Sequence, residues 1–145
     1  MFRARLIGSR RRGGAVLETI LVLPILLYLA FGTVEFGYYF YVKHSCEGAA
    51  RDGCRAAIPA GATYANITSA VGTAMSAANL GSSGYSVVVQ DNGTTVASLS
   101  SAVAGDTITV TVNCTWGTAG QGYRPWNMIG SSKVVSGNAV MRKEG

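Results

Sequence analysis

The amino-terminal third of the chain is dominated by an apolar run, residues 15–42, in which Glu18 and Glu35 are the only charged side chains. As a helix, these 28 residues would be about 42 Å long at about 1.5 Å per residue, whereas the hydrocarbon layer of a bilayer is about 30 Å thick. The run is therefore predicted to be a transmembrane helix that extends beyond the bilayer on one side.

Basic residues are distributed unevenly around this run. Five arginines lie in the leader, residues 1–13, which holds no acidic residue, and the first basic residue after the run is Lys43. Because basic residues concentrate on the cytoplasmic side of a span, the amino terminus is predicted to lie in the cytoplasm. Tyrosine rings favour the membrane interface, so three tyrosines are expected at the outer end of the span: Tyr38, Tyr39 and Tyr41.

The net charge of +5 does not indicate nucleic-acid binding. Without the leader, seven basic side chains are balanced by seven acidic ones. A nucleic-acid-binding domain carries its basic excess on the folded surface, whereas here the excess lies beside a membrane segment. We therefore expect no nucleic-acid partner.

The position of the small residues argues against an ordinary secretory signal. Such a signal is cut at a small-x-small site that follows its apolar stretch. Here aromatic residues follow the run, and the small residues Gly13 and Gly14 precede it. A cut at the glycines would leave the membrane helix on the mature protein.

Glu18 is unusual because a carboxylate in lipid costs about 2.5–3.5 kcal/mol on insertion scales and is rarely found there without a partner. Cutting the Gly13–Gly14 bond would create an α-amino group that is largely protonated near neutral pH. Residues four apart meet on a helix surface, so the Gly14 amine could pair with Glu18, as could the amine of a neighbouring subunit. The alternative is a solvated first-turn acid that the helix dipole favours.

Glu35 lies 17 residues beyond Glu18, which corresponds to about 25 Å along a helix. The two acids therefore roughly bracket the hydrocarbon layer. Glu35 is expected to be a second membrane-edge acid that is solvated at the interface; contact with a partner helix is the alternative.

Beyond the span, the pattern predicts an α+β domain. Helical spacing continues through residues 43–58 and returns in residues 64–80, after Pro59 and Gly61. The period then changes to two, which predicts a hairpin over residues 87–97 and strands at 108–113 and 133–141. The expected fold is a long amino-terminal helix, a second helix and an antiparallel sheet of three or four strands.

The three cysteines allow one disulfide at most. Cys46 and Cys54 would be about 12 Å apart on a continuous helix, too far to bond to each other. Cys114 lies on a predicted strand and could reach one of them, and Cys54 is favoured because it shares a small apolar face with Ala50 and Ala57. A Cys54–Cys114 disulfide in an oxidising compartment and three buried free thiols both fit the sequence.

Little in the chain is suited to catalysis. The single histidine, His44, lies near Cys46, but no second pair of ligands follows at zinc-like spacing. A phosphate-binding glycine loop and a nucleophile motif are both missing from the sequence. We therefore expect no enzymatic activity, no metal, no cofactor and no small-molecule substrate.

Several motifs together carry a resemblance to a known family. Arg12-Gly13 is followed after four residues by Glu18, then by the segments LVLP (21–24) and FGTVEFG (31–37). The small-residue segment GAARDGCR (48–55) and the ending AVMRKE (139–144) complete the pattern. It resembles the TadE-like pseudopilins of the tight-adherence pilus, firmly over residues 11–58 and more weakly at the carboxyl end.

The resemblance implies cleavage by a prepilin peptidase after Gly13, which would make Glu18 the fifth mature residue; a cut after Gly14 is the alternative. It implies a pilin-like minor subunit in pilus assembly, whose partners are the peptidase, other pilin-like subunits and the assembly platform. The expected division is a cytoplasmic leader (1–13), a transmembrane helix (14–42) and an extracytoplasmic domain (43–145). A single-pass anchored protein that binds a ligand or a surface, outside any filament, is the competing interpretation.

Overall fold

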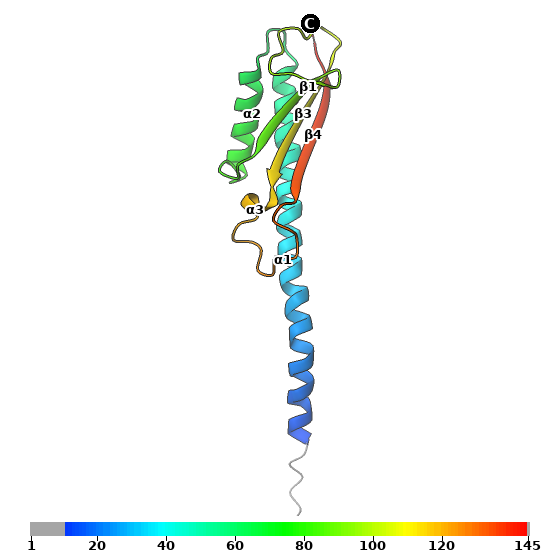
Figure 1. The fold of residues 1–145 in the computed structure, drawn as a ribbon, viewed down its shortest axis with the longest axis vertical. Helices are drawn as coiled ribbons and strands as arrows, with labels where there is room; N and C mark the ends of the chain where they lie inside the picture. Colours follow the sequence, from blue (N-terminus) through cyan, green and yellow to red (C-terminus); the bar gives the residue numbers. More distant parts are fainter. Residues whose placement is uncertain (1–10, 145) are drawn as a thin grey trace, which may run out of the picture.

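The computed structural model describes residues 11–144, so most of the predicted leader lies outside the described part of the chain. One helix, α1 (Arg11–Ala57), is 47 residues long and continues through Pro24. At about 1.5 Å per residue it is about 70 Å long. Its amino-terminal half stands clear of the rest of the protein, and its carboxyl-terminal half lies within the folded domain (Figure 1).

A four-stranded antiparallel sheet forms the second layer. It consists of β1 (Ser86–Asp91), β2 (Thr94–Thr95), β3 (Thr107–Thr115) and β4 (Val134–Arg142), in the order β2-β1-β3-β4. Along β3 every second side chain is buried, as the alternation of apolar and threonine residues predicts. These inward residues are Ile108, Val110, Val112 and Cys114.

The helix α2 (Tyr64–Ala77) lies beside α1, and both helices cover the same face of the sheet (Figure 1). Thr63 and Asn66 form a capping box at its start, which satisfies backbone N–H groups of the first turn. Its buried residues are at helical spacing: Ile67, Val71 and Met75. The predicted α+β fold, with a long helix, a second helix and an antiparallel sheet, is confirmed. A short helix, α3 (Trp116–Ala119), begins the connection from β3 to β4.

Two glycines allow the elements to approach closely. A Cβ atom on Gly137 of β4 would collide with the α1 backbone at Cys46 and Glu47. On α1, a Cβ atom on Gly53 would lie 2.8 Å from Cγ2 of Val71 and 3.2 Å from Cγ1 of Val110. The strand β4 therefore crosses α1 backbone against backbone, which fixes where the sheet sits on the helix.

The carboxyl end of the chain returns to the end of α1 (Figure 1). The buried Nζ of Lys143 donates to the carbonyls of Ala57 and Pro59 at 3.3 and 3.2 Å. These bonds satisfy carbonyl groups at the helix end, and a cation there also interacts favourably with the helix dipole. The tail thus closes the domain at the end opposite the exposed part of α1.

Candidate functional site

The exposed half of α1 is the largest unusual surface of the protein. Every residue from 13 to 31 is exposed, and most of these side chains are large and apolar. A helix that is apolar on all sides must be covered by lipid or by other helices. These 19 residues are about 28 Å long as a helix, close to the thickness of the hydrocarbon layer. By length and composition, α1 is the one candidate membrane span in the described chain.

Gly13 and Gly14 lie in the first turns of α1, and a Cβ atom on either would meet nothing within 4 Å. The bond between them is therefore unobstructed by the domain. Each glycine weakens a helix by about 0.5–1 kcal/mol relative to alanine, so the helix is easiest to unwind at this pair.

Glu18 lies in the same helix, four residues after Gly14, as expected. It is seven residues beyond the first residue of α1, so in the uncut chain it is not a first-turn acid. Among side chains 13–144, none forms an ion pair with Glu18. It borders a shallow hollow along α1 together with apolar or small neighbours: Thr19, Val22, Leu23 and Leu26.

Glu35 is not solvated, which corrects the expectation for this residue. Its side chain is fully buried. One carboxylate oxygen accepts a hydrogen bond from the backbone N–H of Met128 at 3.1 Å, and the other accepts from Ile129 at 2.9 Å. The partner of this acid is thus the domain itself, through residues 123–130, here called the return loop. This contact could not be predicted from the sequence, because the donors are backbone groups more than 90 residues away.

Aromatic rings hold the return loop along α1. The ring of Trp126 lies 6.0 Å from that of Tyr28 and 6.1 Å from that of Phe31, centroid to centroid. The ring of Tyr123 stacks on Tyr38 at 4.0 Å. The contacts of the domain with α1 therefore begin at Tyr28, well inside the apolar run.

Tyr38 and Tyr39 are not free interfacial rings, in contrast to the prediction. Both are half-buried, and Tyr39 packs edge-on against the buried Trp116 at 5.3 Å. Tyr41 remains exposed, and its hydroxyl donates to the carbonyl of Ala78. The rest of the domain therefore packs against α1 through these three tyrosines.

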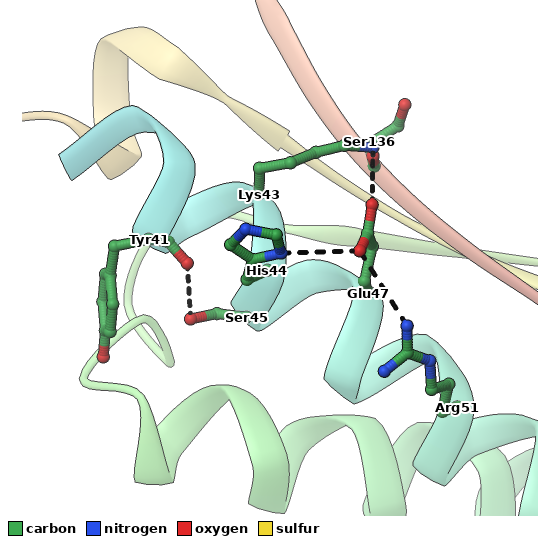
Figure 2. Close-up of polar contacts among 7 residues, drawn as sticks. All are labelled: Tyr41, Lys43, His44, Ser45, Glu47, Arg51 and Ser136. Atoms are coloured by element: carbon green, nitrogen blue, oxygen red, sulfur yellow. Dashed lines mark hydrogen bonds and ion pairs between the residues drawn. The ribbon is translucent and has the colours of Figure 1, made fainter. Parts of the chain in front are cut away.

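A polar cluster follows on α1 (Figure 2). The carboxylate of Glu47 lies 3.2 Å from Lys43 Nζ, 3.6 Å from His44 Nδ1 and 4.0 Å from Arg51. The hydrogen bond from Lys43 lowers the pKa of Glu47. Lys43 also donates to the carbonyl of Ser136 on β4, so the cluster fastens β4 to α1. Glu47 and Arg51 are four residues apart on one helix face, and His44 is mostly exposed.

The cysteines are arranged differently from the prediction, and the pairing of Cys54 with Cys114 is corrected. The Sγ atom of Cys114 lies 3.4 Å from that of Cys46. Cys54 instead directs its Sγ to the carbonyls of Ala139 and Ile108, at 3.1 and 3.8 Å. The reason is the direction in which α1 crosses the sheet: Cys46 meets the end of β3, and Cys54 lies two turns away near its start. All three residues are buried free thiols.

These features define a protein with one amino-terminal membrane-anchor helix that carries a small α+β domain. Residues 13–55 match the family model described as TadE-like protein, which confirms the resemblance seen in the sequence. The match covers the exposed part of α1 and nearly all of its buried part, and leaves α2 and the sheet outside. No curated protein and no solved structure matches the chain.

Proposed function

We propose that the protein is a minor pseudopilin of a tight-adherence pilus, with a structural rather than a catalytic role. The observation that carries this proposal is the family match over α1, combined with an exposed apolar stretch that holds a single acid. In this proposal residues 13–31 pass through lipid before assembly and pack against helices of other pilin-like subunits afterwards.

The proposed processing step supplies the partner of Glu18. A prepilin peptidase cuts after Gly13, and the new amine of Gly14 lies on the same helix face as the carboxylate four residues on. In a filament the amine of the neighbouring subunit can take the same place. Pairing removes much of the cost of an isolated carboxylate in lipid, about 2.5–3.5 kcal/mol.

In this arrangement the domain lies at the membrane–water interface on the side of the bilayer away from the cytoplasm. The return loop reaches α1 at Tyr28 and Phe31, where the fully exposed stretch ends. Trp126, half-exposed beside these rings, is suited to the headgroup region because indole rings favour it. The leader then lies in the cytoplasm, and the domain lies outside.

The experiment is to produce the full chain in cells that carry a prepilin peptidase and to measure the intact mass of the membrane-bound form. The proposal expects a mature chain that begins at Gly14, and Gly13→Val is expected to leave the precursor uncut because a branched side chain replaces the glycine at the cut. Gly37→Ala is the matched control, since a Cβ atom there meets nothing within 4 Å and lies far from the cut.

One outcome would correct the cut site, and another would contradict the assignment. A mature chain that begins at Ala15 would move the cut to the second glycine. A chain that keeps its leader despite an active peptidase would favour an anchored protein that binds a ligand or a surface outside a filament, because an anchor needs no such cut.

A further inference from the structure

The buried thiols of Cys46 and Cys114 form a pair that neither the fold nor the proposed assembly explains. Their Sγ atoms are 3.4 Å apart although the residues are 68 positions apart in the chain. One lies on α1, one turn beyond Val42, and the other lies near the end of β3. Both side chains are fully buried, so neither is placed to react with small reagents once the domain is folded.

The immediate surroundings favour bond formation at this pair rather than at Cys54. Ser83 Oγ, also buried, lies 3.7 Å from Cys114 Sγ and donates to the carbonyl of Leu80. The thiol of Cys54, in contrast, has two carbonyl oxygens as its neighbours. A disulfide needs about 2.0 Å between sulfur atoms, so Cys46 and Cys114 must approach by only about 1.4 Å, which side-chain rotation can supply.

We propose that Cys46 and Cys114 form a disulfide that joins α1 to β3 when the domain folds outside the cytoplasm, and that Cys54 remains a thiol. The location of the domain outside the cytoplasm, which this inference assumes, rests on the proposed function. The bond would connect the anchor helix covalently to the sheet, beyond the packing and the Lys43–Ser136 contact that already hold them together. Tension applied through the anchor would then reach the sheet directly.

The oxidant is an extracytoplasmic disulfide, carried by a thiol oxidoreductase or by a small molecule. One cysteine thiolate attacks it, which forms a mixed disulfide and releases one oxidant sulfur as a thiol. The second cysteine thiolate then attacks the mixed disulfide, which forms the Cys46–Cys114 bond and releases the other oxidant sulfur. The pair thus loses two protons and two electrons, and the oxidant becomes a dithiol. Because the folded pair is buried, the first exchange occurs before β3 closes onto α1.

The reduced pair is also polarised. The hydrogen bond from Cys46 lowers the pKa of the Cys114 thiol to about 7. The same contact raises the pKa of Cys46, and burial adds to that effect. In the folded and reduced pair, Cys114 is therefore the residue that more readily loses its proton to become a thiolate, the nucleophilic form of cysteine.

Peptide mapping tests the proposal, because trypsin separates the two helix cysteines. Cleavage after Lys43, Arg51 and Arg55 places Cys46 in one peptide (44–51) and Cys54 in another (52–55). The full chain is taken from membranes, its free thiols are alkylated under denaturing conditions, and it is digested without reductant by trypsin and chymotrypsin. The expected products are a 44–51 peptide linked to the Cys114 peptide and an alkylated 52–55 peptide. A Cys54–Cys114 species, or full alkylation of all three residues, would overturn the inference.

A second arm separates this inference from the proposed location. The purified full chain is reduced and unfolded in denaturant, and is then refolded in detergent in the presence of oxidised glutathione. The Cys46–Cys114 bond should form here whatever the topology in cells, and its absence in correctly refolded protein would overturn the pairing itself. Protease accessibility of the domain in intact spheroplasts reports the location independently, and the mature amino terminus reports the pilin assignment.

Thermal unfolding supplies a quantitative readout. Closing a loop of this length should make the Tm of the oxidised chain higher than that of the reduced chain by on the order of 10 °C. Cys54→Ser is the matched control and should keep this reductant-dependent shift, whereas Cys46→Ser and Cys114→Ser should abolish it. If either of the latter variants fails to fold, the mapping of the unaltered chain still decides the question. A shift that survives Cys46→Ser would contradict the proposal.

Discussion

The contact between Glu35 and the return loop gives the sharpest test of how the domain is seated on its anchor helix. Replacing Glu35 by alanine removes the acceptor of two charge-assisted hydrogen bonds, at 2.9 and 3.1 Å, and leaves the N–H groups of Met128 and Ile129 without their partner. Hydrogen bonds to charged groups contribute about 1.5–3 kcal/mol each. Part of this loss is offset in the alanine variant, because it has no carboxylate that must be desolvated when the domain folds.

Glu35→Ala is therefore expected to lower the free energy needed to open the return loop locally by about 2–4 kcal/mol. Since 1.4 kcal/mol corresponds to a factor of ten, the amides of Met128 and Ile129 should exchange roughly 30-fold to several hundred-fold faster. Glu35→Gln retains one acceptor oxygen and should give an intermediate increase. The measurement is hydrogen exchange by mass spectrometry on the full chain in nanodiscs.

Glu47→Gln is the matched control for this test. Glu47 lies on the same helix, twelve residues further along, and its ion-pair partners are on α1; one of them, Lys43, also bonds β4 at Ser136, and none contacts the return loop. Exchange in residues 123–130 should be unchanged in this variant. Equal exchange of the Met128 and Ile129 amides in Glu35→Ala and in the unaltered chain would refute the reasoning that the carboxylate holds the loop.

Two further predictions concern the folded domain. Gly137→Ala should destabilise the domain by about 3 kcal/mol or more in denaturant unfolding, because the new methyl group would overlap the α1 backbone at Cys46 and the strand must move away. Gly48→Ala on α1 is the control. A Cβ atom there meets nothing within 4 Å, so this variant should be neutral or stabilising. Hydrogen bonds from Asn92 and from the backbone of Val103 lower the pKa of Asp106, so its contribution to stability is present above the pKa of the unfolded chain and is lost as the pH falls through the lower folded value. Below about pH 4 the unaltered chain should therefore lose Tm more steeply than Asp106→Asn, and parallel curves would contradict this assignment.

The elements with a clear period could be predicted from the sequence. The alternation of Ile108, Val110 and Val112 with threonines identified β3, and the helical spacing of Ile67, Val71 and Met75 identified α2. These signals are local, because each strand or helix buries one face of its own regular pattern. The resemblance over α1 was likewise present in contiguous residues, and the family match begins and ends within them.

The contacts between elements could not be predicted, because they depend on the angle at which α1 crosses the sheet. That angle decides that Cys46, rather than Cys54, faces Cys114. The partner of Glu35 is a pair of backbone N–H groups in a loop with no periodic pattern. Nearly every residue has such a group, so the sequence does not indicate which ones bind the carboxylate. Gly137 is the exception, since an isolated glycine in a predicted strand is itself a signal of close backbone approach.

The most direct test of the central proposal is to count pili and mature protein together in cells that carry Glu18→Ala in place of the unaltered chain. The substitution leaves the Gly13–Gly14 bond intact. It also lies outside the contacts of the folded domain with α1, because these contacts begin at Tyr28. The account predicts a stable, membrane-bound chain and a severe loss of surface pili, because the subunit can no longer pair its carboxylate with an α-amino group during assembly. Pili in normal number with the alanine variant would contradict it.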